Sequence, residues 1–122
     1  GLTAFTIENV FQELLSPQFP DSHFGIRKGK ISVLIPVSCQ LDRPLVQIEQ
    51  LTERLIGFLS DTFQLSLKAG ISSLQSHEKI PEARLQADTS REYQRLFETG
   101  RICLYETIPQ KQIIGSIPLT TS

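Results

Sequence analysis

The fold is decided by residues 23–36, which read HFGIRKGKISVLIP. From His23 the sequence pattern acquires a period of two, which is typical of strands, over residues 23–27 and again from Ile31 to Val37. Between these runs lies Arg27-Lys28-Gly29-Lys30, where glycine supplies the positive φ that a tight hairpin turn needs. The stretch therefore predicts a β-hairpin, and the partial alternation of its second strand predicts cover on both faces.

Apolar residues at helical spacing lie on both sides of the hairpin. The first helix is predicted from one apolar stripe, and Ser16-Pro17 ends it; the stripe consists of Ile7, Val10, Phe11, Leu14 and Leu15. A second, long helix is predicted to start at Asp42-Arg43-Pro44, with Asp42 as the capping side chain and Pro44 in the first turn. Its buried stripe is expected to contain Leu45, Ile48, Leu51, Leu55, Phe58 and Leu59, and its wet face Gln47, Glu49, Gln50, Glu53 and Arg54.

The second half of the chain predicts a strand, a helix and a last strand. Gln64 to Ser72 alternates most clearly, and Arg101 to Glu106 forms the final strand. Between them a helix is predicted from near Ile80-Pro81 to Thr99-Gly100, with Gly100 as its cap. One side of this helix carries a thin, partly polar stripe that is expected to pack closely on the sheet: Ile80, Ala83, Ala87, Ser90, Gln94 and Phe97.

The predicted order is α-β-β-α-β-α-β, which indicates an α+β sandwich with helices on a mostly antiparallel sheet. We expect one domain over residues 1–108. Residues 109–122 are expected to be a C-terminal tail or linker toward a DNA-binding domain outside this chain. Because this tail has no convincing period, an arm, an added strand and disorder all remain open.

Composition narrows the possible functions. The 122 residues carry a formal net charge of −1, so no basic excess is present to neutralise a nucleic-acid backbone. Cys39 and Cys103 are interpreted as reduced thiols rather than a disulfide or a zinc site. The longest apolar run, Ile31 to Val37, is far shorter than the ~20 residues of a membrane helix. With no signal peptide at the start, we expect a cytoplasmic protein without direct membrane contact.

The hairpin resembles that of the diguanylate cyclase (GGDEF) family, where Gly-Gly-Asp-Glu-Phe is followed by a hydrophobic strand that ends in Leu-Leu-Pro. Here Val33-Leu34-Ile35-Pro36 is similar to the strand end. Counting back from Pro36 places Arg27-Lys28-Gly29-Lys30-Ile31 over the signature pentapeptide.

The chain resembles still more closely the degenerate GGDEF-like domain found in the middle of bacterial AraC-type transcription regulators, and also that of sugar-diacid and purine-catabolism regulators. Residues 7–15 are similar to the first helix of that family, and residues 65–73, LSLKAGISS, to its characteristic strand. Arg91 to Tyr105 resembles its helix-to-strand passage through Tyr93, Gly100 and Tyr105.

This resemblance implies a nucleotide cyclase palm, a ferredoxin-like sandwich, whose leading strand is missing from this chain. Cyclase chemistry joins a 3′-hydroxyl to an α-phosphate, and the two Mg²⁺ ions that assist it prefer carboxylate oxygens. At the hairpin the chain offers Lys28 and Lys30, with Gly29 where a metal-binding Asp would lie, and an ammonium group repels Mg²⁺. We therefore expect no enzyme activity, catalytic residue, metal or cofactor.

Other candidate sites are weaker. Arg27, Lys28, Gly29 and Lys30 could bind an anion such as a nucleotide or a phosphorylated effector, although a solvated hairpin tip with charged gatekeeper residues is the better explanation. His23 and His77 are each alone, without a second metal ligand at suitable spacing.

Three functions compete. The first is a regulatory module that relays a signal or stabilises dimers, through self-association and through neighbouring domains of the parent protein. The second is a sensor that binds a nucleotide or phosphorylated effector in a vestigial cyclase cleft, and the third is an enzyme. Because no helix-turn-helix is present, DNA binding is expected only from another domain. Candidate dimer contacts are the thin stripe of the 80–97 helix and the tail residues Ile113 and Ile114.

Overall fold

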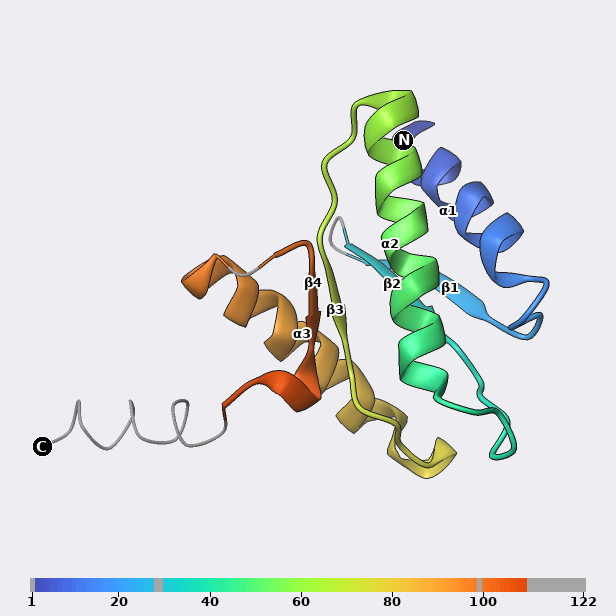
Figure 1. Ribbon diagram of the computed structural model, residues 1–122, viewed down its shortest axis with the longest axis vertical. Coiled ribbons are helices and arrows are strands. Elements are labelled where there is room, and N and C mark those ends of the chain that lie inside the picture. The colour runs from blue at the N-terminus through green and yellow to red at the C-terminus, as the bar shows by residue number, and fades with distance from the viewer. Residues whose placement is uncertain (1, 28–29, 99, 110–122) are drawn as a thin grey trace, which may run out of the picture. The chain divides into compact units, whose positions relative to one another are not determined.

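The computed structural model of the protein describes residues 2–27, 30–98 and 100–109 (Figure 1). These residues form three α-helices, four strands and two 3₁₀ turns, so the α+β class is confirmed. Along the chain the succession is α1 (Leu2–Leu15), β1 (His23–Arg27), β2 (Lys30–Leu34), α2 (Pro44–Phe63), β3 (Ala69–Ile71), η1 (His77–Lys79), α3 (Ile80–Phe97), β4 (Ile102–Leu104) and η2 (Tyr105–Thr107). The chain divides into two compact units, Gly1–Leu67 and Lys68–Ser122.

The first unit contains the predicted hairpin and its two flanking helices. Strands β1 and β2 pair antiparallel, with Phe24 opposite Val33 and Ile26 opposite Ile31. Directly opposed residues share one face of a sheet, so these four apolar side chains lie on the same side. That side meets α1, where the ring of Phe11 lies 5.7 Å from that of Phe24.

The core of this unit lies between α1 and α2. Ile7 of α1 and Leu55 and Leu59 of α2 are buried together. Leu65 and Leu67 pack against them from the segment after α2. Burying a leucine-sized side chain contributes roughly 1.5–3 kcal/mol, so each member of this cluster adds substantially to the unit's stability.

The start of α2 differs from the prediction. Pro44 is the first helical residue, as expected, but the N-cap is Arg43, which adopts the left-handed backbone with φ 47°. No side chain caps this end, so the prediction that Asp42 is the cap was wrong. The backbone oxygen of Asp42 instead accepts a 2.7 Å hydrogen bond from Nε2 of Gln47. Phe58 was also misplaced in the buried stripe; it is 47% exposed, with its ring edge-on to Phe63.

The strand predicted over Gln64 to Ser72 is much shorter in the structure. Only Ala69–Ile71 forms a ladder. Residues 64–68 precede it and belong to no strand. Their alternation arises because Leu65 and Leu67 pack inward while Ser66 is exposed. The alternation of apolar and polar residues over 64–68 therefore arises from burial of one side of the segment and does not indicate strand pairing.

The second unit is a β-α-β arrangement. Strands β3 and β4 pair parallel, with Gly70 opposite Cys103, whereas the sequence predicted a mostly antiparallel sheet. Helix α3 connects them, as parallel neighbours require a crossover. Strand β4 ends at Leu104 and gives way to η2, so the last predicted strand is also shorter than expected.

Helix α3 packs closely on β3, as predicted. A Cβ at Gly70 would stand 2.5 Å from the backbone oxygen of Ala87 and 2.9 Å from Cβ of Ser90. The middle of the thin stripe is therefore confirmed as the packed face, with Ser90 and Gln94 fully buried. Its ends are not: Ile80 and Phe97 are 38% and 51% exposed.

The end of α3 falls before the predicted glycine stop. The last helical residue is Phe97, and the C-cap is Glu98, with φ 50° and its N–H donated to the oxygen of Gln94. The prediction that Gly100 caps the helix was therefore wrong.

Across the described residues, no helix is both long and apolar enough to span a bilayer.

Candidate functional site

The predicted anion site lies at the turn between β1 and β2. Lys28 and Gly29 fall outside the described residues, so their part of this prediction stays a prediction. The backbones of Arg27 and Lys30 are register partners at the end of the hairpin, and Lys30 is exposed. The structure thus places the two flanking residues of the site opposite each other in the ladder.

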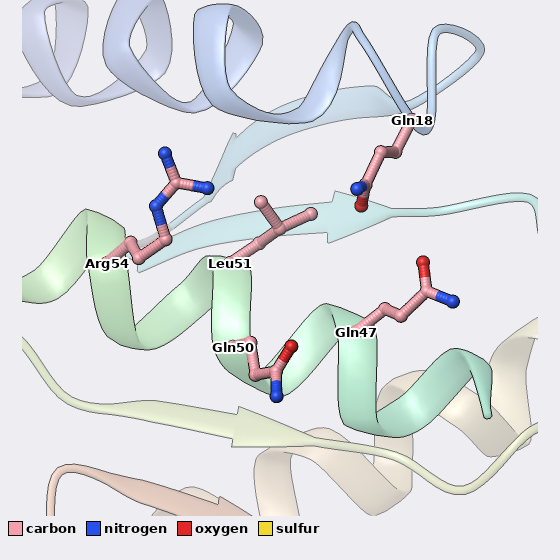
Figure 2. A pocket seen from close by; sticks show the side chains of 5 residues that line it. All are labelled: Gln18, Gln47, Gln50, Leu51 and Arg54. Atoms are coloured by element: carbon pink, nitrogen blue, oxygen red, sulfur yellow. The ribbon is translucent and has the colours of Figure 1, made fainter.

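The structure contains a second polar region that the sequence did not indicate. A depression of about 310 Å³ lies in the first unit and is lined by Gln18, Gln47, Gln50, Leu51 and Arg54. Figure 2 shows Gln47, Leu51 and Arg54 on the side of α2 toward which Gln18 reaches from the segment after α1, with Gln50 at the edge of this group. Positions 47, 50, 51 and 54 share a helix face because they are separated by three, four and seven residues.

The lining of this depression combines one cation with three primary amides. Nε2 of Gln47 donates to the backbone oxygen of Asp42 at 2.7 Å, which holds that amide in place. Leu51 is 7% exposed and supplies an apolar patch between the polar groups. The sequence does place Gln47, Gln50 and Arg54 on the wet face of α2. It carries no signal for Gln18, because that contact depends on the path of the chain after α1.

Two glutamine amides of α3, one fully and one partly buried, have a structural role. The fully buried side chain of Gln94 accepts a 2.8 Å hydrogen bond from Nη1 of Arg91 and donates at 3.2 Å to the backbone oxygen of Gly100. Oε1 of Gln86 accepts from both the backbone N–H and the hydroxyl of Ser73, at 3.0 and 2.7 Å. The bonds to Gly100 and Ser73 tie α3 to the segments that flank it in sequence, and together with the bond from Arg91 they satisfy both polar atoms of the Gln94 amide and Oε1 of Gln86.

The two thiols differ in environment. Cys39 is exposed and Cys103 is buried on β4, and neither is in a disulfide. Burial raises the pKa of the Cys103 thiol, while a side-chain hydrogen bond with Ser90 acts in the opposite direction. A raised pKa keeps a thiol protonated and poorly nucleophilic, so the environment of Cys103 is that of a structural residue.

Ionised side chains that could bind a metal do not gather in the part of the chain that the structure describes. No group of three or more His, Cys, Asp or Glu residues there could hold a metal ion. His23 and His77, the two lone histidines, are exposed. On the exposed surface of α3, an ion pair joins Arg95 to Glu92. The hydrogen bond that Arg95 donates to Glu92 raises the pKa of Arg95.

Two regions therefore stand out: the basic hairpin turn, of which the structure describes the flanks, and the amide-lined depression on α2. The first was found from the sequence and the second from the structure. The chain was compared with protein-family models, with curated proteins and with solved structures, and none of the three comparisons gave a match.

Proposed function

We propose that this chain is a non-catalytic regulatory domain of a bacterial AraC-type transcription regulator, where it relays a signal or stabilises a dimer. The proposal is carried by the antiparallel hairpin of β1 and β2, which follows α1 and precedes α2. In the cyclase family this hairpin bears the acidic signature, whereas here its turn reads RKGK. Basic side chains oppose the binding of divalent metal that cyclase chemistry needs.

The finer fold proposed is a cyclase palm that lacks its leading strand. The observed succession of helices and strands supports it, because removing the first strand from a palm leaves α-β-β-α-β-α-β. Among the described residues, β1 pairs only with β2 and β3 only with β4, so the outer edge of either pair could accept a further strand. Circular dichroism of the parent protein's longer domain should show more strand per residue than this chain does. An unchanged strand fraction would contradict the palm.

Self-association is supported by apolar side chains on the outside of α3. Leu85 and Leu96 are 65% and 60% exposed, and eleven residues correspond to about three helical turns, so they share one face. The thin stripe of α3 is packed on β3 through Ser90 and Gln94, which removes the centre of that stripe as a dimer contact. The other candidates, Ile113 and Ile114, lie outside the described residues.

Sedimentation equilibrium tests the dimer directly. The wild-type chain should show concentration-dependent association, and L85D with L96D should abolish it. L74D is the matched control, because Leu74 is also exposed, at 53%, but lies outside α3. A wild-type chain that stays monomeric at all accessible concentrations would argue against a dimerisation role.

Nucleotide binding separates the regulatory proposal from the sensor alternative. A thermal melt of the chain with GTP, ATP and a cyclic dinucleotide, each with Mg²⁺, should give no shift if the domain acts only through protein contacts. A saturable shift that disappears in K28Q/K30Q would favour a sensor instead. Formation of pyrophosphate from GTP would overturn the non-catalytic assignment.

A further inference from the structure

We propose that the depression on α2 binds a small organic carboxylate that also carries an amide or hydroxyl group. This inference does not rest on the regulatory function proposed above, since it concerns only the residues around Leu51. It follows from the size of the depression, its single cation and the hydrogen-bonding groups of its three glutamines.

The size sets the class of occupant. About 310 Å³ lies at the lower end of the range for small-molecule pockets, which is room for a metabolite-sized molecule. The lining comes from one helix face and from Gln18, all within the first unit. Positions on a regular helix are held more precisely than those on loops, so three of the four polar groups are placed on a rigid scaffold.

The positive charge of the lining indicates a negatively charged ligand. Arg54 is the charged residue among the five that line the depression, and no carboxylate accompanies it there. Within the described chain, its guanidinium makes neither an ion pair nor a hydrogen bond. A guanidinium presents a planar fork of donors that matches a carboxylate in bidentate fashion. One such cation suits a monocarboxylate better than a phosphate dianion.

The three glutamines indicate which uncharged polar groups the ligand contains. Nε2 of Gln47 is engaged by the oxygen of Asp42, which leaves its Oε1 as an acceptor directed by that bond. The side-chain amides of Gln18 and Gln50 make no hydrogen bond to the described residues, so each offers donors and an acceptor. Primary amides recognise groups that both donate and accept, which are amides and hydroxyls. Leu51 would contact an apolar carbon between the ligand's two polar ends.

Three probes separate these contributions. N-acetylglycine carries both a carboxylate and an amide, N-acetylglycinamide lacks the charge, and acetate lacks the amide. In ¹H–¹⁵N spectra of the full chain, N-acetylglycine should shift the side-chain amides of the three glutamines and the Nε–H of Arg54, in a saturable manner. We expect binding at least about tenfold weaker for each of the other two probes, because each loses one charge-assisted or amide contact.

Variants of Arg54 make the test decisive. R54Q removes the charge at an exposed helix position while keeping a good helix former, so folding should be retained, and it should weaken N-acetylglycine binding about tenfold. The affinity of R54K for N-acetylglycine should lie between those of wild type and R54Q, because lysine keeps the charge and loses the planar set of guanidinium donors. R84Q on α3 is the matched control and should bind like wild type.

Several results would overturn the proposal. Equal shifts with N-acetylglycine and N-acetylglycinamide would show that no anion is recognised. Shifts centred on the hairpin turn, or unchanged affinity in R54Q, would place the binding elsewhere. Tighter binding of inorganic phosphate than of N-acetylglycine would reject the carboxylate class. Sedimentation of R54Q reports separately on self-association, so failure of one proposal leaves the other to be judged by its own measurement.

Discussion

Gly70 and Ala87 approach each other so closely that no side chain fits between strand β3 and helix α3. A Cβ at Gly70 would lie 2.5 Å from the backbone oxygen of Ala87, closer than carbon and oxygen approach in folded proteins. Because that obstacle is backbone, it cannot turn aside as a flexible side chain would. Glycine is required here by the closeness of the helix rather than by its own backbone angles.

We expect G70A to destabilise the protein by about 1–3 kcal/mol, since an added methyl group must push α3 away from β3. Urea unfolding followed by circular dichroism measures the change. G25A is the control, because a Cβ at Gly25 meets no atom within 4 Å. Equal stability of G70A and wild type would show that α3 can move away without loss.

The opposite effect is expected at Gly57, in the interior of α2. A Cβ there has open space around it, and alanine restricts the unfolded chain more than glycine does. G57A should therefore stabilise the protein by about 0.5–1 kcal/mol. The same urea titration tests this, and a lower midpoint for G57A would contradict an unobstructed helix at that position.

Gln94 should be intolerant of truncation. Its amide is completely buried and has a partner for each end, Arg91 and the oxygen of Gly100. Q94A would leave the Gly100 oxygen without its donor and create a cavity, at a combined cost of about 2–4 kcal/mol. Q12A, at an exposed position of α1, should change the unfolding free energy by less than about 0.5 kcal/mol.

The two cysteines should react at very different rates with a thiol reagent such as DTNB at neutral pH. Exposed Cys39 should react quickly, while Cys103 should react slowly because it is buried and its pKa is raised. C39S should remove the fast phase alone, and urea should release the slow one. Two fast thiols in the folded wild type would contradict the placement of Cys103.

The raised pKa of Cys103 also fixes the sign of a pH effect. The folded state holds the thiol proton more tightly than the unfolded state, so this contribution to stability is complete below the ordinary thiol pKa of about 8.5 and declines as pH rises above it. Comparing wild type with C103A in urea at pH 7 and pH 9.5 isolates it. Cys103 should account for a fall in stability at the higher pH, and a rise would refute this.

The sequence predicted elements that depend on local pattern and missed those that depend on distant partners. The bounds of β1, the proline start of α2 and the start of α3 at Ile80 follow from periodicity and proline chemistry. The strand over residues 64–72 was overestimated because alternation also arises where a segment lines a core. The stop at Gly100 was misplaced because Glu98 adopts the left-handed backbone in its stead.

The two candidate sites differ in the same way: one depends on neighbouring residues in the sequence and the other on residues that are distant in it. The basic turn is contiguous in sequence, so it could be identified from residues 27–30 alone. The depression on α2 brings Gln18 to residues about thirty positions further along the chain. The wet face of α2, predicted from the sequence, contains three of its polar groups, but only the folded path of the chain after Leu15 reveals the fourth, Gln18.

The left-handed residues at the helix ends are a resource for protein engineering. Arg43, Gln64 and Glu98 each hold a conformation that costs a residue with a Cβ roughly 1–2 kcal/mol. Replacing Gln64 and Glu98 by glycine would relieve this steric burden with no new contact to design. A heat-tolerant form of the protein could thus be sought at the points where its helices stop, leaving the surfaces proposed for recognition untouched.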